Sequence, residues 1–494
     1  MSVSFNSIPS DLKVPLFYAE VDNSQANTAT SAMPRLIVGQ VNDDAVATEI
    51  GKLTLVPSLS LAKSIGGVGS MLAEMYDTWR AIDPAGEVWC LPVKATGTKA
   101  AGKVTVTGTA TAGGQINLYV AGQRVRATIS NGATAAATAT AIAAAVNAAG
   151  LSVSAVAATG EVTLTCRWAG LSGNDIQLQL NRQGRANGEV TPAGLTVTVT
   201  AMAGGVGTPD LAGAIAVLGD EPFEFLCGPW ADATSLDAWK SLMNDSSGRW
   251  SWSRQLYGHV YTGLRGTLGE LVALGDTRND AHVTVYGFEK SCPDPVWRQV
   301  AAYTARQAVF ISADPARPTQ TGELNGITPA PAGERFMLTE RQSLLSHGIA
   351  TAFAQSGTQR IERAVTTYQK NEYGQTDNSY LDSETLHQSA YIIRFLKGRI
   401  TSKYGRHKLA NDGTRFGAGQ AIVTPAVIRA EMIAGYFILE QMGIVENADA
   451  FAKYLVVERS TTDPTRVNVL YPPDLVNQLR VFALQYQFRL QYQV

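Results

Sequence analysis

The chain ends in LRVFALQYQFRLQYQV, residues 479–494. From Phe482 to the last residue every second side chain is apolar or aromatic, and from Gln485 onward the residues between them are polar. Successive residues of a strand point to opposite faces, so this alternation predicts a β-strand with one apolar face and one wet face. At about 13 residues it is much longer than the usual 5–6.

A strand of this length needs a partner for its backbone groups, and an open edge is a template for another chain. Two interpretations follow. The segment is either an internal edge strand that closes a local sheet or an arm that completes a sheet in a neighbouring subunit. The candidate contact positions of the arm are Phe482, Leu484, Tyr486, Phe488, Leu490 and Tyr492.

Residues 1–33 are predicted to form a second arm and its linker. Residues 14–21 (VPLFYAEV) read as a strand, with Val14, Leu16 and Tyr18 as candidate contacts. About 20 extended residues can span roughly 60–70 Å, which is enough to reach an adjacent subunit. The polar stretch 23–31 and the pair Pro472-Pro473 are expected to be the flexible roots of the two arms.

Composition limits the classes of function. A chain of 494 residues is too long for one core and predicts two to four domains. Charged residues are 17%, the net charge is -2 and no long run of either sign occurs, which argues against a nucleic-acid partner. No apolar stretch has membrane-spanning length, and residues 1–9 do not resemble a signal peptide. We therefore expect a soluble protein, made in a reducing cytoplasm, with no membrane partner.

Strands alternate with helices in two stretches, residues 34–93 and 205–335, which we expect to form one mainly parallel α/β core. Between them, residues 94–204 are poor in charge and rich in Ala, Gly, Thr and Val. Short strands and one Ala-rich helix ending at Gly150 predict an inserted β-rich domain there, placed on the outside.

Residues 336–473 are predicted to be a C-terminal α+β layer, followed by the arm at 474–494. Strands 349–353 and 359–367 are expected to pair as a hairpin in this layer, with a long helix from Ser383 to about Tyr404. A second helix has Thr424 as its N-cap, Pro425 at its first position and Gly443 after its last turn. Residues 453–458 and 466–470 are predicted to form another hairpin.

Residues with potential chemistry are scarce. Gly67-x-Gly69 has Leu72 where a dinucleotide fingerprint needs its third glycine, so a helix start is expected and not a phosphate site. Asp220-Glu221 and the pair Asp382 and Glu384 are expected to cap helices or to be solvated. No catalytic serine, zinc-protease or P-loop motif occurs. Five histidines stand singly in the sequence: His259, His282, His347, His387 and His407. Four dispersed cysteines fit neither a zinc site nor a disulfide framework: Cys90, Cys166, Cys227 and Cys292. A Trp/Arg cluster is expected to pack in the core or at a subunit contact: Trp239, Trp250, Trp252, Arg249 and Arg254.

The order of these parts resembles the sheath protein of contractile phage tails, most closely the Mu-like tail sheath family. The stretches that carry the resemblance are IPSDLKVPL (8–16) with DNS (22–24), GVGSM (67–71), GLSGNDI (170–176), RFMLTERQSLLSHG (335–348) and the strand 479–490. The resemblance covers the whole chain and is weakest over residues 100–165.

This resemblance implies a structural subunit, not an enzyme, that needs no cofactor and no metal. Sheath subunits stack as hexameric rings around a tail tube, exchange terminal strands and contract to drive the tube through the host envelope. It implies the tail tube, baseplate and tail terminator proteins as partners and the virion tail as the location, after assembly in the host cytoplasm. The alternative is an α/β hydrolase whose terminal strand forms a dimer contact.

Overall fold

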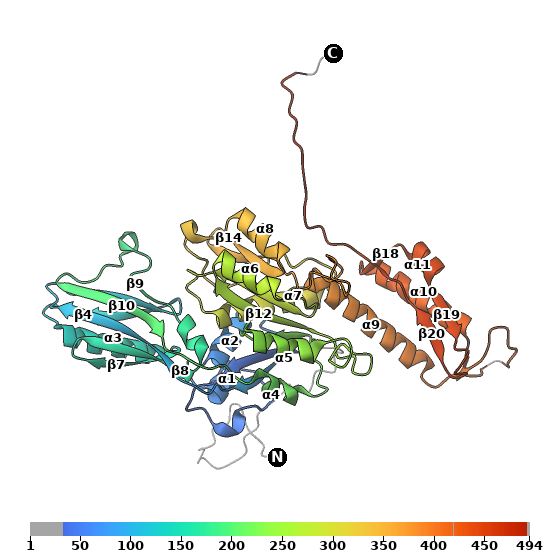
Figure 1. The fold of residues 1–494 in the computed structure, drawn as a ribbon, viewed down its shortest axis with the longest axis horizontal. Helices are drawn as coiled ribbons and strands as arrows, with labels where there is room; N and C mark the ends of the chain where they lie inside the picture. The colour runs from blue at the N-terminus through green and yellow to red at the C-terminus, as the bar shows by residue number, and fades with distance from the viewer. Residues whose placement is uncertain (1–32, 418, 492–494) are drawn as a thin grey trace, which may run out of the picture. The chain divides into compact units, whose positions relative to one another are not determined.

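The structure is a computed structural model that describes residues 33–417 and 419–491 (Figure 1). The chain divides into two compact units. The first unit comprises the chain up to Val309 and residues Gln320–Ser383. The second unit comprises Phe310–Thr319 and Glu384–Val494. Among the helices of the described residues, none combines the length and the apolar character needed to cross a membrane.

An eight-stranded sheet forms the centre of the first unit, in the order β15-β14-β13-β12-β11-β1-β3-β2. The six inner strands are parallel, and only the edge strands β2 and β15 run antiparallel to their neighbours. This agrees with the predicted mainly parallel α/β core. The strands are β1 Arg35–Gln40, β2 Thr54–Leu55, β3 Val88–Val93, β11 Phe225–Cys227, β12 His259–Gly266, β13 Val283–Glu289, β14 Ile349–Gln355 and β15 Thr358–Arg363.

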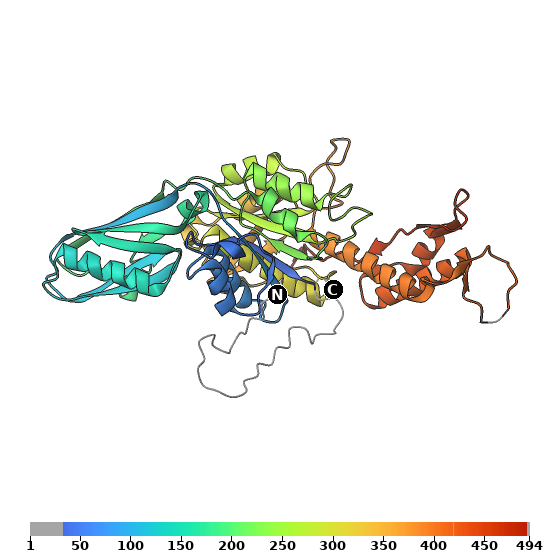
Figure 2. The ribbon, with the colours of Figure 1, turned by 90° about the horizontal axis from the view of Figure 1, so that it is seen from below.

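The inner strands are mostly buried, and β1 and β11 are buried at every residue, as expected for a parallel sheet covered on both faces. Tyr286 of β13 stacks on Tyr303 of α7 on one face, and α2 meets α7 there through Glu74 and Trp297. On the other face Gly287 lets α6 approach the sheet, since a Cβ atom there would lie 3.1 Å from the side chain of Leu271. Helices flank the central sheet on both sides (Figure 2). The helices of this unit are α1 Leu59–Gly66, α2 Met71–Arg80, α4 Leu211–Ile215, α5 Ala233–Met243, α6 Leu268–Asp276, α7 Val296–Ala313 (which continues into the second unit) and α8 Leu338–Ser346.

Residues 94–204 form two antiparallel sheets and one helix, α3 Ala135–Ala149, which packs on β6 and β7. Thr134 caps this helix and Gly150 ends it in the left-handed conformation, as predicted. Bridges between Ala95 and Pro209 and between Thr98 and Val206 hold the two ends of the region side by side. The strands are β4 Lys99–Gly108, β5 Gly114–Val120, β6 Gln123–Ile129, β7 Val153–Ala158, β8 Glu161–Ala169, β9 Leu178–Leu180 and β10 Leu195–Ala203.

The hairpin β14–β15 differs from the prediction in its place. The two strands pair antiparallel as expected, but β14 continues the central sheet by pairing with β13 and does not belong to a C-terminal layer. The reason is the short parallel register between Val285 and Ile349, a contact that hairpin signals in the sequence cannot reveal. The second compact unit consequently resumes only at Glu384.

The second unit is built around two helices, α9 Ser383–Tyr404 and α10 Pro425–Gln441. Thr424 accepts the capping hydrogen bond from Val427, and Gly443 has φ +72°, so both predicted ends of α10 are confirmed. Tyr436 stacks on Phe451 in the core. A helix, α11 Ala448–Tyr454, occupies the start of the predicted strand 453–458. The remaining strands are β16 Lys408–Leu409, β17 Ile422–Val423, β18 Val445–Glu446, β19 Val456–Arg459, β20 Val467–Leu470 and β21 Asp474–Leu475.

Candidate functional site

The C-terminal segment is exposed and has no strand partner within the described chain. Residues 476–491 contain no helix or strand (Figure 1). The described candidate contacts are all strongly exposed, up to 96% at Leu490, and the rings of Tyr486 and Phe488 stack 6.2 Å apart on one side of the extended chain. Both interpretations, an internal edge strand and an arm that pairs with a neighbour, therefore stay predictions. The candidate contacts Val14, Leu16, Tyr18 and Tyr492 lie outside the described residues.

The prediction that the arm separates from the subunit at Pro472-Pro473 is wrong. Directly after the prolines, β21 pairs with β18. Beyond β21, the amide of Gln478 donates to the carbonyl of Ala316 at 3.4 Å, and Arg480 Nη2 lies 3.1 Å from Glu384 Oε1. Proline removes one backbone donor but does not prevent the next residues from docking. The exposed arm therefore begins after Arg480.

The predicted capping or solvated role is wrong for Glu384. Its side chain is 0% exposed, and besides Arg480 it accepts hydrogen bonds from the backbone and hydroxyl of Thr319 at 3.1 and 2.7 Å. A buried carboxylate is tolerated only with such partners. Asp382 binds Arg363 through two hydrogen bonds of 2.7 and 2.8 Å, while Asp220 is exposed and pairs with Arg254.

The carboxyl edge of the central sheet is occupied by residues of the 94–204 region. In open α/β sheets, ligands bind outside the carboxyl ends of the strands at the point where strand order reverses, here between β1 and β11. Gln40, at the end of β1, donates to the carbonyl of Ala169 at 2.9 Å and accepts from Ser172 Oγ at 2.6 Å. Trp168 donates to the same hydroxyl at 3.0 Å and is fully buried. Side chains of the protein itself therefore occupy the position at which an α/β enzyme would bind its ligand.

Asp175 connects the same region to the next strand ends. One carboxylate oxygen lies 2.9 Å from Arg265 Nε, and the other accepts the Val296 backbone N–H at 2.6 Å. Burial raises the pKa of Asp175 to about 6, against the opposing effect of the Arg265 guanidinium. Burial likewise raises the pKa of Glu74 to about 7, although Trp297 Nε1 donates to it at 2.7 Å. Both acids serve packing of the sheet edge.

The Gly67-x-Gly69 turn starts α2, as predicted. Ser70 caps the helix by accepting from the Ala73 N–H at 3.1 Å. A Cβ atom on Gly69 would lie 2.2 Å from the carbonyl oxygen of Leu151. The close approach that the glycine permits is therefore to protein backbone.

The histidines on the central sheet are packed side chains. His259 Nε2 lies 2.9 Å from Thr284 Oγ1, and His282 lies 3.1 Å from Asp245 and stacks on Trp250. Trp239 is buried in the core, whereas Trp252 is 83% exposed. Within residues 33–417 and 419–491, no three His, Cys, Asp or Glu side chains gather as metal ligands would.

The four cysteines are free and buried. Burial raises the pKa of Cys166 and of Cys227 to about 12, and it raises the pKa of Cys90 and Cys292 further. A thiol that stays protonated at neutral pH is a poor nucleophile and a poor metal ligand.

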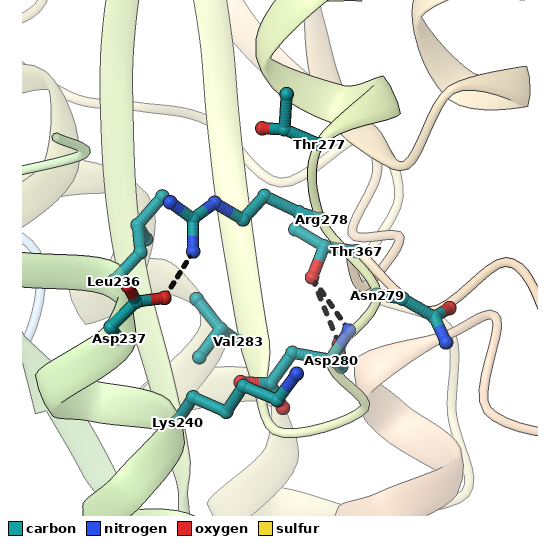
Figure 3. Close-up of a pocket in the computed structure, with 9 residues that line it drawn as sticks. All are labelled: Leu236, Asp237, Lys240, Thr277, Arg278, Asn279, Asp280, Val283 and Thr367. Carbon is teal, nitrogen blue, oxygen red and sulfur yellow. Dashed lines mark hydrogen bonds and ion pairs between the residues drawn. The ribbon is translucent and has the colours of Figure 1, made fainter. Parts of the chain in front are cut away.

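A small polar cavity of about 130 Å³ lies beside α5 and the loop after α6 (Figure 3). Arg278 pairs with Asp237 at 2.6 Å across it, and Thr367 holds Asp280 through hydrogen bonds to its backbone. The cavity adjoins Val283, the first residue of β13, and therefore lies at the amino end of that strand. Ligand sites of parallel sheets lie at the opposite end.

Comparisons with known proteins agree on one family. A family model described as the phage tail sheath protein central domain matches residues 204–367, and one described as the phage tail sheath C-terminal domain matches residues 375–489. The chain is 38% identical over 495 residues to the Mu-like prophage FluMu tail sheath protein of Haemophilus influenzae, covering 99% of this chain and 100% of that protein.

Two solved structures are similar at low identity. The sheath tail protein of Desulfitobacterium hafniense has a TM-score of 0.47 at 12% identity, over 94% of this chain and 97% of that one. The contracted helical sheath of the anti-feeding prophage has a TM-score of 0.48 at 11% identity, over 96% and 99%. The full-length match and the two family models decide the assignment: the chain belongs to the phage tail sheath protein family.

Proposed function

We propose that this chain is the sheath subunit of a contractile tail, which polymerises as stacked hexameric rings around a tail tube and contracts to drive the tube through the host envelope. The observation that carries the proposal is the exposed arm, residues 481–491, in a chain of this family. The free energy of contraction would be stored in subunit packing, so no nucleotide, cofactor or catalytic group is required. The hydrolase alternative has no support from the family.

The arm has the properties of a strand awaiting a partner. It exposes five large apolar or aromatic side chains in alternation and carries a single charged residue, Arg489. A long exposed apolar edge is a liability unless another chain covers it. Each ladder hydrogen bond contributes about 0.5–1.5 kcal/mol. Each buried large side chain adds about 1.5–3 kcal/mol, so half a dozen bonds and a few such side chains exceed the cost of ordering the arm.

We infer that the receiving edge is the hairpin β19–β20 of a neighbouring copy. It forms a sheet of only two strands, which is marginal by itself. Val456, Val469 and Leu470 are exposed on it. An added strand from the arm would extend the sheet, and its apolar side chains would lie beside the exposed apolar side chains on one face of the hairpin. The N-terminal arm, residues 1–20, is proposed to act in the same way.

The proposed partners are further copies of this chain, the tail tube protein and the baseplate and tail terminator proteins, in the virion tail after assembly in the host cytoplasm. Negative-stain microscopy of the purified chain tests the proposal. Tubes or rings are expected, and compact dimers with hydrolase activity would overturn it.

A further inference from the structure

Arg480 and Glu384 form an enclosed ion pair at the root of the C-terminal arm. Their side chains are 11% and 0% exposed, and Nη2 lies 3.1 Å from Oε1. The same oxygen accepts the backbone N–H and the hydroxyl of Thr319. Charge-assisted hydrogen bonds of this kind are stronger and more directional than neutral ones. Removing one partner of a buried pair leaves an uncompensated charge, which makes the contact hard to break.

Further contacts hold the few residues before Arg480. Val445 and Glu446 pair with Leu475 and Asp474. Gln388, one turn after Glu384 on α9, donates to the carbonyl of Ile444 at 2.6 Å. It also reaches the carbonyl of Val476 at 3.5 Å. The root is therefore docked on the second unit up to Arg480, and the exposed arm starts at the next residue.

The residues that hold Arg480 occupy a special place in the chain. Thr319 is the last residue of the first stretch of the second unit, and Glu384 is the first residue of its second stretch. The chain passes between its two compact units at three positions, and two of them lie at these residues. Arg480, 96 residues beyond Glu384, thus fastens the arm root to two of the three passages, and all three residues belong to the second unit.

We infer that Glu384 and Arg480 are positioning residues for assembly. They fix where the arm leaves the subunit, and they connect the arm, when a neighbour holds it, to two of the three passages of the chain between the units. This inference rests on the proposed role of the arm. A load applied to residues 481–491 reaches Arg480 first and passes to Glu384 and Thr319. A flexible root would absorb that load without transmitting it.

Glu384→Gln tests the inference in the full-length protein, because it keeps the shape of the side chain and removes its charge. Limited trypsinolysis measures how firmly Arg480 is held in the unassembled subunit. Cleavage after Arg480 should be slow in the wild type and at least tenfold faster in the variant, while cleavage after the exposed Arg489 stays the same. Hydrogen exchange of the Thr319 amide should rise in parallel. Glu372→Gln, at an exposed position of the first unit, is the matched control.

Polymerisation is then followed by light scattering and microscopy. Folded Glu384→Gln protein should need at least about tenfold more protein to form tubes. Unchanged cleavage after Arg480 would overturn the anchor, and faster cleavage with unchanged polymerisation would overturn the positioning role. Arg480→Met, read by exchange at Thr319 and by polymerisation, decides the matter if Glu384→Gln does not fold. A chain lacking 481–494 that still forms tubes would instead refute the proposed function of the arm.

Discussion

Ser172 donates a hydrogen bond of 2.6 Å to Gln40, the last residue of β1 and 132 positions away in the chain. Gln40 is 1% exposed. The Gly-Leu-Ser-Gly-Asn-Asp stretch therefore closes the carboxyl edge of the central sheet while the rest of the 94–204 region folds on its own sheets. Two consequences follow. Removing the 94–204 region should lower the stability of the protein, and the carboxyl edge of the central sheet has no open crevice for a ligand.

Replacing residues 97–204 with a short Gly/Ser linker should leave a protein that polymerises but is less stable. The bridges Ala95–Pro209 and Thr98–Val206 place the ends close enough for a short linker. The deletion removes Asp175, the ion-pair partner of Arg265, so the free energy of unfolding should fall. Urea unfolding measures the loss, and adding Arg265→Met should recover part of it. Folded deletion protein without tubes would show that the region makes subunit contacts.

Stability should fall as pH rises toward neutrality because of Glu74. With a pKa raised to about 7, its carboxyl retains a proton in the folded state that the unfolded chain releases near pH 4.5. Its contribution is full below about pH 4.5 and is lost as pH passes through about 7, a change of about 1–3 kcal/mol. Asp175 acts in the same direction at lower pH.

Glu74→Gln should therefore remove most of the decrease in the free energy of unfolding between about pH 6 and 7, because above about pH 7 Glu74 is deprotonated in both the folded and the unfolded state. Arg298, Asp294 and Asp77 also act on Glu74 and remain in the variant. Urea unfolding at several pH values gives the slope. An exposed carboxylate, changed by Glu372→Gln, should leave the wild-type slope, and an unchanged slope in Glu74→Gln would contradict the assignment.

Gln487→Pro should leave a folded monomer that cannot polymerise, because proline removes a ladder donor from the middle of the arm. Circular dichroism and the melting temperature should match the wild type, since the arm adds little to the fold of its own chain. Gln487→Ala keeps the backbone N–H and should still form tubes. Deleting 481–494, which keeps Arg480 on Glu384, tests the arm as a whole, and a collapse of the melting temperature would show that the arm packs on its own subunit.

A cysteine pair can locate the receiving edge. Phe488→Cys combined with Val469→Cys should give a ladder of disulfide-linked oligomers in oxidised tubes, because the four native cysteines are buried and do not interfere. Phe488→Cys combined with Val156→Cys, an exposed position on β7, is the control. Equal ladders from both pairs would argue against β19–β20 as the partner of the arm.

The protein should not bind ATP with a dissociation constant tighter than about 100 μM, nor hydrolyse peptides. The carboxyl edge of the sheet is filled by Trp168 and Ser172, and the Gly69 turn is packed against Leu151. Isothermal titration calorimetry and a peptide-hydrolysis assay check this. Tight nucleotide binding would contradict the proposal that contraction needs no bound fuel.

Local features were predictable from the sequence because their causes are local. The helix α9 begins and ends where expected, and Thr424, Pro425 and Gly443 bound α10 through short-range capping and steric effects. The alternation of strands and helices indicated the parallel core, since burial on both faces selects continuous apolar strands. The two-residue period of residues 479–494 predicted a strand, whereas the described residues 479–491 form no strand within this chain, so this strand stays a prediction.

Tertiary structure decided which distant residues meet. Three contacts join residues that are 64 to 132 positions apart. They are the Glu384–Arg480 ion pair, the hydrogen bond from Ser172 to Gln40 and the pairing of β14 with β13. Nothing in the neighbouring sequence marks Glu384 as buried, because its partners arrive from two other segments. The charge of a buried carboxylate is tolerated only where packing brings a cation and donors to it. The local sequence therefore set the elements and the arm, and long-range packing set where the arm is held.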